Sequence, residues 1–340
     1  MTTVAIAYNT PVSDDPSERG VLRQVEAIES SLQECGYVVT VLALDEPARF
    51  VGDIALARPD VIVNCCEAFA GRAHLEMSVA GFFELLGLAY TGSPPLTLGM
   101  AQHKALAKSV LRAHGIPTPR HAVLESDADV DAADGLVWPR IVKPVAQDAS
   151  IGIDVGAVVH DRAGLADRVH HLMNVVDGAA LVEEYIDGRE FMVALLARSG
   201  RLTALPIEEL DFGGVPVSHP RIVTFDSKWS AGSPAYLGTR ATWPSLDRRL
   251  VERLNAVALS AAHAVGLRDY GRVDCRMNER GELFVLEVNP NPDIGPDSGF
   301  ALTCNVAGLS YADLARTIVE SALARRPAPV RPPPPPGGAA

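Results

Sequence analysis

The sequence is poor in cysteine, and its cysteines form no recognisable framework. It contains five, an odd number, and none of them belongs to a paired CxxC set. Structural zinc sites use such pairs, and small secreted scaffolds use an even set of closely spaced cysteines. We therefore expect neither a zinc site nor a disulfide framework in this protein.

Positive charge is scarce as well. Lysine and arginine number 30 against 42 aspartates and glutamates, which gives a formal net charge of -12. A protein that binds the nucleic-acid backbone needs a basic face to neutralise the phosphates. The composition therefore argues against a nucleic-acid partner, and any phosphate-bearing ligand is expected to be small and locally held.

Long apolar runs are absent too. No stretch approaches the roughly 20 apolar residues that a membrane helix needs. The first ten residues, MTTVAIAYNT, lack the basic region and the long apolar core of a signal peptide. These features predict a soluble cytoplasmic protein without a membrane partner.

A dinucleotide-binding fingerprint is also missing. The first expected strand, Val4 to Asn9, is followed by Thr10-Pro11 and not by a GxGxxG turn. That turn is what brings the backbone close to a pyrophosphate in nicotinamide-dependent enzymes. An oxidoreductase is therefore poorly supported.

The remaining composition is that of a folded protein with several lobes. A chain of 340 residues exceeds one ordinary core, so two or three packed lobes are expected. Strand and helix patterns alternate in residues 1–95, which predicts a parallel α/β lobe. Strands dominate residues 96–190 and 191–326, so these are predicted to be α+β. Residues 327–340 form a proline-rich run that cannot build a core and are predicted to be a disordered tail.

Two segments of the middle are predicted from their periodicity and composition. Residues 97–114 read as one helix that Gly115 terminates. Residues 211–244 are rich in Gly, Pro, Ser and Thr and carry little periodicity. A loop of that length is usually functional or disordered.

The clearest chemical pattern is a predicted hairpin near the C-terminus. Alternating strands at 270–277 and 283–289 flank Arg280-Gly281, which we expect to form a two-residue turn. In that register one face carries only apolar side chains, namely Val273, Cys275, Met277, Phe284, Leu286 and Val288. The other face pairs Asp274 with Glu287 and Arg272 with Asn289, while Glu279 faces Glu282 at the turn.

The paired carboxylates indicate a metal site. Two carboxylates that face each other directly repel unless a cation lies between them. Mg²⁺ prefers oxygen ligands and usually takes one or two protein carboxylates, which Asp274, Glu287 and the Asn289 carbonyl would supply. Two metals are feasible on such a set. The alternative is a solvated polar face, on which lysine and arginine neighbours neutralise the pair.

Lysines and a glycine-containing loop offer a place for phosphates. Lys143 ends an expected strand and is followed by a loop with Ser150 and Gly152 at its tip. Backbone N–H groups of such a loop can cover phosphates as a lid, with Lys143 as a point charge beneath. A plain β-turn is the alternative. Lys104 and Lys108 lie four residues apart on one helix face, although most lysines are simply solvated.

A further edge follows at residues 181–191, where two strands are joined by a turn. A strand edge of this kind can bind an adenine through backbone groups, while a later carboxylate takes the ribose hydroxyls. An acidic exposed turn is the equally good alternative.

Taken in order, these pieces resemble the ATP-grasp superfamily, and most closely its D-alanine–D-alanine ligase branch. The resemblance runs from about Val61 to Glu320. The segments that carry it are Glu84 to Ser93, His103-Lys104 to Pro119, Ile141 to Pro144, Glu183 to Phe191, Gly271 to Asp274, and Glu287 to Asn289.

The resemblance implies an ATP-grasp fold and a division of the chain. Residues 1–95 would be the parallel α/β lobe on the substrate side. Residues 96–190, with the phosphate lid loop, and 191–326, with the metal site, would be two α+β lobes that hold ATP between them.

The resemblance also implies roles for individual residues. ATP phosphates would meet Lys104, Lys143, the Ser150 loop and, at the γ-phosphate, Lys228. The adenine would meet Glu183 and the backbone of Glu184 and Ile186, and Glu190 would hold the ribose. Mg²⁺, as two ions and with Mn²⁺ as a substitute, would be held by Asp274, Glu287 and Asn289, while Arg272 would stabilise the transferring phosphoryl group.

The implied reaction is a carboxylate–amine ligation. The carboxylate attacks the γ-phosphate, an acyl phosphate forms, the amine displaces phosphate, and ADP is the nucleotide product. The partners implied are small amino-acid or peptide substrates, with a homodimer as the assembly to test. The alternatives are D-alanine–D-alanine ligase itself in peptidoglycan precursor synthesis, a non-catalytic ATP-binding regulator, and a carboxylase-type subunit.

The sequence departs from the family pattern around the substrates. Ala149 replaces a serine of the lid loop, so that only Ser150 can supply the hydroxyl, and Trp229 replaces a tyrosine. The usual Gly-Gly-x-Ser start is missing, although Glu18 is a candidate for the acid that holds the first substrate's ammonium. Asp293 stands where a glycine is usual.

The same comparison suggests a substrate preference. Counting from the metal ligands places Ser298 where the family anchors the amine substrate's carboxylate. Asp293 and Asp297 add negative charge to that loop, which would repel a carboxylate. We therefore expect D-alanine to be a poor second substrate and basic or carboxyl-blocked amines to be better ones. The alternative is that both aspartates face solvent or cap N–H groups of their own loop.

Deleting residues 327–340 is expected to leave the melting temperature and the catalytic rate unchanged, because a proline run buries no apolar area. Thermal unfolding and a steady-state assay of the shortened chain measure both. A clear fall in either would mean that the tail docks on the body.

Overall fold

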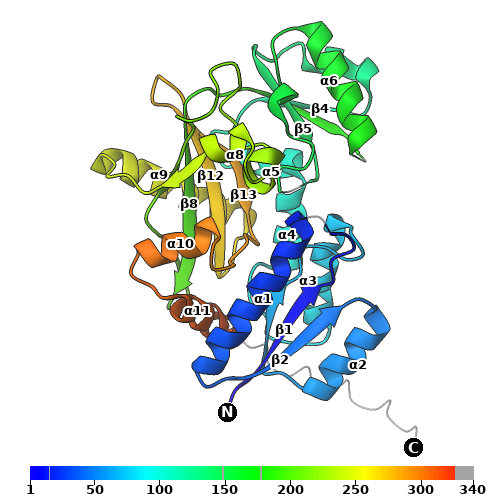
Figure 1. The fold of residues 1–340 in the computed structure, drawn as a ribbon, viewed down its shortest axis with the longest axis vertical. Coiled ribbons are helices and arrows are strands. Elements are labelled where there is room, and N and C mark those ends of the chain that lie inside the picture. The colour runs from blue at the N-terminus through cyan, green and yellow to red at the C-terminus, as the bar shows by residue number, and fades with distance from the viewer. Residues whose placement is uncertain (15, 148, 177, 326–340) are drawn as a thin grey trace, which may run out of the picture.

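The computed structural model describes residues 1–14, 16–147, 149–176 and 178–325, and the predicted tail at 327–340 lies outside them. These residues form three sheets with helices packed on them (Figure 1). None of the helices in the described part of the chain is long and apolar enough to span a membrane. The predicted combination of an α/β lobe with α+β parts is confirmed.

The N-terminal sheet is parallel, with strand order β2-β1-β3. Its elements are β1 (Thr3–Asn9), α1 (Pro16–Glu34), β2 (Val38–Leu44), α2 (Pro47–Ala57), β3 (Val61–Cys65), the 3-10 turn η1 (Ala73–Leu75) and α3 (Glu76–Leu85). β1 is almost wholly buried because helices cover both of its faces. α2 and α3 pack on one face and α1 on the other.

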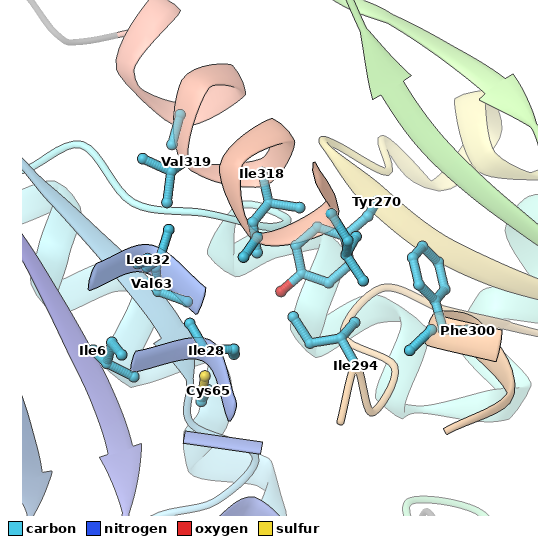
Figure 2. Packing of buried hydrophobic residues seen from close by; sticks show 14 of the residues in the cluster. Ile6, Ile28, Leu32, Val63, Cys65, Tyr270, Ile294, Phe300, Ile318 and Val319 are labelled. Atoms are coloured by element: carbon cyan, nitrogen blue, oxygen red, sulfur yellow. The ribbon is translucent and has the colours of Figure 1, made fainter. Parts of the chain in front are cut away.

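The last helix, α11 (Tyr311–Ala324), also belongs to this lobe. Figure 2 shows Ile318 and Val319 of α11 packed close to Leu32 of α1 and Val63 of β3. The same apolar cluster contains Tyr270 and Phe300, which come from the region after residue 265. The end of the chain therefore ties the N-terminal lobe to the rest of the molecule.

The four-stranded sheet is antiparallel, with order β4-β7-β5-β6, and α6 covers it (Figure 1). Its elements are β4 (His121–Leu124), η2 (Asp127–Ala133), β5 (Arg140–Pro144), η3 (Val155–Ala157), β6 (Val158–Val159), α6 (Arg162–Val175) and β7 (Ala180–Glu184). The two helices before it are α4 (Pro95–Gln102) and α5 (Lys104–Ala113).

The prediction of one helix over residues 97–114 is wrong. The helix breaks at His103, whose backbone leaves the helical region, and α5 starts afresh at Lys104. The His103 side chain accepts a hydrogen bond from Leu106 N–H, which caps the new helix.

The six-stranded sheet has the order β11-β10-β8-β12-β13, with β9 paired to β8. Its elements are β8 (Arg189–Arg198), β9 (Arg201–Ala204), β10 (Glu208–Asp211), α7 (Phe225–Trp229), α8 (Pro234–Gly238), β11 (Arg240–Thr242), α9 (Arg248–Val265), β12 (Tyr270–Met277), β13 (Leu283–Asn289) and α10 (Gly299–Val306). The segment 211–244, expected to be irregular, thus contains two short helices and a strand.

The hairpin turn between β12 and β13 differs from the prediction. Asn278 N–H donates to Glu282 O and Gly281 N–H donates to Asn278 O, so three residues and not two form the turn. Gly281 has φ +75°, a conformation that glycine adopts without strain. Glu279 therefore does not face Glu282.

A second irregularity offsets the first. The register shifts by one residue between the pairs Cys275–Val285 and Asp274–Glu287, which leaves Leu286 as the extra residue of a β-bulge. The turn and the bulge each add one residue, so their effects on the strand register cancel. The predicted pairs Asp274–Glu287 and Arg272–Asn289 are confirmed. The predicted core positions of Phe284 and Leu286 are wrong, because Leu283 and Val285 take them and Phe284 lies opposite Arg276 on the other face.

An ion pair between a buried carboxylate and an exposed arginine joins the N-terminal lobe to the sheet. Asp269, 3% exposed, receives a hydrogen bond from Gly92 N–H (2.9 Å) and an ion pair from Arg325, whose Nη2 lies 2.7 Å from Oδ2. Arg325 Nη2 also donates to Tyr90 O at 3.2 Å. These bonds connect residues that lie between 56 and 235 positions apart in the chain.

Replacing Asp269→Ala is expected to lower the free energy of unfolding by roughly 3 kcal/mol, because Arg325 and Gly92 N–H lose a buried partner. Urea unfolding measures the change. As a control, Arg316→Ala removes exposed ion pairs with Asp313 and Glu320 and should cost within about 0.5 kcal/mol. Equal effects of the two changes would contradict the assigned role of Asp269.

Candidate active site

One face of the six-stranded sheet carries the ionisable side chains in rows, because residues directly opposite each other on neighbouring strands share a face. α9 packs on the other face. Three rows can be read from the strand register, and they are Leu210–Glu190–Arg276–Phe284, then Glu208–Met192–Asp274–Glu287, then Ala194–Arg272–Asn289. We call these the outer, middle and inner rows. The predicted metal residues all lie in the middle and inner rows.

The middle row brings together the two predicted metal carboxylates. Both oxygens of Asp274 are bonded by Arg272, with Nε to Oδ1 at 2.6 Å and Nη2 to Oδ2 at 2.9 Å. Burial alone would raise the pKa of Glu287, but nearby cations outweigh it and lower that pKa to about 2. Those cations are Lys104, Lys143, Arg272 and Lys228. Glu287 is therefore ionised at neutral pH.

The donor set fits Mg²⁺ in kind, since it consists of two carboxylates and an amide oxygen. No group of three or more His, Cys, Asp and Glu side chains that could hold a metal occurs in the described ranges. Any metal here would therefore depend on Asn289 and on ligands from outside the protein. The Asn289 amide oxygen is fixed by the N–H of Asn291 at 3.0 Å.

Asn291 connects this amide to the N-terminal lobe. Its side-chain nitrogen donates to Glu76 Oε1 at 2.9 Å and to Cys66 O at 3.1 Å, and Tyr270 O–H approaches its oxygen at 3.4 Å. Glu76, 8% exposed, lies at the start of α3. The position of Asn289 is therefore coupled to the N-terminal lobe.

A buried network holds the predicted phosphate lysine. Glu183 has one oxygen 2.8 Å from Lys108 Nζ and the other 2.8 Å from Lys143 Nζ. Burial alone would raise the pKa of Glu183, but the two ammonium groups keep it below its usual value. Burial lowers the pKa of Lys108 to about 8, against the pull of Glu183.

Lys108 also links the four-stranded sheet to the six-stranded sheet, and we call the region between these sheets, where the middle row and Lys143 lie, the cleft. Its ammonium group donates to Leu286 O at 2.8 Å and to Thr118 Oγ1 at 3.0 Å. Leu286 is the bulge residue of β13, so the ammonium group links α5, β7 and the bulged strand. The sequence pattern did not assign Lys108 to the site, although its spacing from Lys104 was visible.

The lid loop and the long segment 211–244 meet over the cleft. Ala149 and Ser150 both have positive φ, +54° and +61°, so the loop tip is sharply turned. Trp229 Nε1 donates to Ala149 O at 3.2 Å, and Phe225 N–H donates to Ile153 O. The tryptophan thus joins the loops as a donor, next to Lys228.

Lys104 lies under the same loop and its ammonium group donates to Gln147 O. It is 5% exposed, and Lys143 is 7% exposed. Both predicted phosphate lysines are therefore near the middle row, since both act on the pKa of Glu287.

The outer row contains the predicted ribose residue. Glu190, 5% exposed, lies opposite Arg276, and Arg276 Nη1 is 3.4 Å from its Oε2. Burial raises the pKa of Glu190, while Arg276 opposes that rise. The Arg276 guanidinium lies over the rings of Tyr185 and Phe212, at 5.3 and 5.7 Å. Arg276 was not expected at the site.

The strand edge predicted to bind adenine lies at the end of β7 and in the turn after it. Glu184 N–H donates to Arg120 O, and its carboxylate receives Val137 N–H at 3.0 Å. Ile186 belongs to the turn that follows. Gly188 then passes so near β12 that a Cβ would lie 2.0 Å from Met277 O, which requires glycine there. The turn is thereby pressed against the hairpin.

The predicted substrate residues make local contacts. Glu18 accepts the N–H groups of Val12 and Ser13 at 2.8 and 3.0 Å, so it holds the loop after β1. Asp293 accepts Gly295 N–H at 2.7 Å, and Ser298 caps α10 by accepting Ala301 N–H. Asp293 thus caps an N–H group of its own loop, which was the alternative to its repelling a substrate carboxylate.

Comparison with known proteins agrees with this geometry. The family model described as the D-ala D-ala ligase C-terminus matches residues 110–320. A D-alanine–D-alanine ligase of Stutzerimonas stutzeri is 34% identical over 311 residues, covering 90% of this chain and 91% of the relative. One from Pseudomonas putida is 32% identical over 316 residues, covering 91% of each chain. An uncharacterised protein of Sinorhizobium fredii is 30% identical over 94% of each chain.

A solved structure shows the same fold. The D-alanine–D-alanine ligase of Bacillus anthracis complexed with ATP superposes with a TM-score of 0.77 at 24% identity, covering 96% of this chain and 99% of the other. The family model spans most of the chain and the relatives match it nearly end to end. The chain therefore belongs to the D-alanine–D-alanine ligase family and is an ATP-grasp ligase, an enzyme that forms C–N bonds.

Proposed function

We propose that this ligase consumes ATP with Mg²⁺, releases ADP, and joins an amino-acid-like carboxylate to an amine through an acyl phosphate. The observation that carries the proposal is the middle row, where Asp274 and Glu287 face each other beside Arg272. The names of the relatives support D-alanine as a carboxylate substrate. We expect a soluble cytoplasmic enzyme, and we propose the homodimer as the assembly to test.

The residues at the cleft fit the charge changes of phosphoryl transfer. Lys104, Lys143 and Lys228 would neutralise phosphate oxygens, and Lys143 keeps N–H donors beyond the one that faces Glu183. Asp274, Glu287 and Asn289 would hold Mg²⁺. When bound, Mg²⁺ neutralises phosphate charge and fixes the orientation of the phosphates.

Arg272 would stabilise the phosphoryl group in transit. Its guanidinium already lies in the inner row, held by Asp274, so little reorganisation precedes the reaction. Ser150 and the N–H groups of its loop would cover the phosphates from the other side and exclude water.

The nucleotide would lie along the outer row. Glu183 and the backbone of Glu184 and Ile186 would take the adenine, and Glu190 the ribose hydroxyls. Glu18, Asp293 and Ser298 would border the substrates, the first on the N-terminal lobe and the others beside α10.

Two buried cysteines are consistent with direct attack by the amine. Burial raises the pKa of Cys65 to about 12 and also raises that of Cys275, so neither thiol forms a thiolate at neutral pH. A thiolate is the nucleophilic form of cysteine. No acyl-enzyme intermediate on these residues is therefore needed.

Release of ADP over a panel of D- and L-amino acids and small peptides tests the function. Release that depends on an added amine supports a ligase. Asp274→Asn and Glu287→Gln are each expected to reduce turnover at saturating Mg²⁺ by at least about 100-fold, because the metal site loses a charge. Circular dichroism should stay unchanged, since the apolar face of the hairpin is intact. Full turnover in either variant would remove that residue from the metal site.

Lys143→Ala is expected to raise the KM for ATP roughly tenfold or more, since a charge-assisted hydrogen bond to phosphate is worth about 1.5–3 kcal/mol. Initial rates at varied ATP measure it. The control, Arg162→Ala, removes an exposed ion pair with Asp134 on the same lobe and should leave KM unchanged. An unaltered KM in Lys143→Ala would place the lysine outside the nucleotide site.

A further inference from the structure

Glu208 is a buried carboxylate in the middle row that neither the sequence pattern nor the proposed mechanism uses. It is 4% exposed and lies opposite Met192, which in turn lies opposite Asp274. Two strand spacings, roughly 10 Å, therefore separate Glu208 from Asp274 on one face of the sheet. The side chain belongs to the catalytic face and not to the core under α9.

The carboxylate of Glu208 is pressed against the first turn of α10. A Cβ built on Gly299 would lie 2.7 Å from Glu208 Oε2, so a side chain at this position would require the Glu208 carboxylate to shift. Gly299 directly follows Ser298, the residue that caps α10. Glu208 thus occupies the side of the cleft where the loop after the metal residues ends.

The charge of Glu208 is only partly compensated. Its hydrogen-bond partner is the Thr303 hydroxyl, which also accepts Trp243 Nε1–H at 3.0 Å. Burial raises the pKa of Glu208, and the cation that opposes this rise is Arg272, which is already bonded through two nitrogens to Asp274. One guanidinium is therefore shared between two buried carboxylates, and the excess charge at this end of the cleft is negative.

A helix N-terminus beside an arginine is ordinarily a favourable place for a substrate carboxylate. Here the protein's own carboxylate lies in that place. A second carboxylate brought next to it would be repelled in a site from which water is largely excluded, and a neutral or positively charged group would not.

We propose that Glu208 selects the amine substrate, and that the enzyme takes a neutral or cationic amine, such as one whose carboxyl group is masked as an amide, in preference to a free amino acid. This proposal rests on the proposed ligase function. It assigns the preference among amine substrates to Glu208 of β10 and not to Asp293, because Asp293 caps an N–H group of its own loop.

Two measurements test the proposal, each with D-alanine present as the carboxylate substrate: the rate of ADP release after addition of D-alaninamide or of further D-alanine as the amine, and the ratio of the two ligation products. Calorimetry of D-alaninamide with ADP and Mg²⁺ present reports amine binding. The wild-type enzyme is expected to favour D-alaninamide in both measurements. Glu208→Gln should shift the ratio of the two amines at least about tenfold toward D-alanine, with an unchanged KM for ATP. Glu208→Met, which is apolar and of similar length, should shift it in the same direction.

The matched control is Glu209→Gln. Glu209 is the next residue of β10, points to the opposite face and pairs with Arg189 at 2.6 Å, so its loss should leave the ratio unchanged. A wild-type preference for D-alanine, or an unchanged ratio in a folded Glu208 variant that still releases ADP, would overturn the proposal alone. Absence of amine-dependent ADP release and of amine binding in the wild type would instead overturn the ligase function itself.

Discussion

The register of four antiparallel strands, β10, β8, β12 and β13, determines which side chains meet in the cleft. A shift of one residue in any of them would turn its ionisable groups into the apolar layer under α9. The bulge at Leu286 is part of this constraint, because it returns Glu287 to the face of Asp274 after the three-residue turn. It also frees the Leu286 carbonyl to accept Lys108.

Given that register, the buried charges need partners, because a lone charge away from water is costly. Glu183 is shared by two lysines, Asp274 is held by Arg272, and Glu190 faces Arg276. The cations are thus oriented by the protein before any ligand arrives, which is the arrangement that lowers reorganisation during phosphoryl transfer. Glu208 and Asp274 share Arg272, and Asp274 takes both of the nitrogens that bond it, so the charge of Glu208 is left to act on the substrate in our proposal.

Much of this was predictable from the sequence because it depends on local alternation. The pairs Asp274–Glu287 and Arg272–Asn289 followed from period-two patterning. They were correct because the three-residue turn and the bulge at Leu286, which the pattern does not show, offset each other. Glu208 and Lys108 could not be recognised in the same way. Each looks like an ordinary charged residue in its own segment, and its place in the cleft depends on contacts with β8 or with β13. Long-range pairing of this kind is not encoded in local periodicity.

The split helix at His103 and the link through Asn291 have a common consequence for the cleft. Because α5 starts anew at Lys104, its first turn can approach the lid loop, where Lys104 N–H donates to Val145 O at 2.9 Å. On the other side, Asn291 fastens Asn289 to Glu76 of the N-terminal lobe. The loop after β5 and the N-terminal lobe are thus each bonded to an element that carries a cleft residue. A displacement of either would therefore change the geometry around Asp274, Glu287 and Asn289 and not only the access to them.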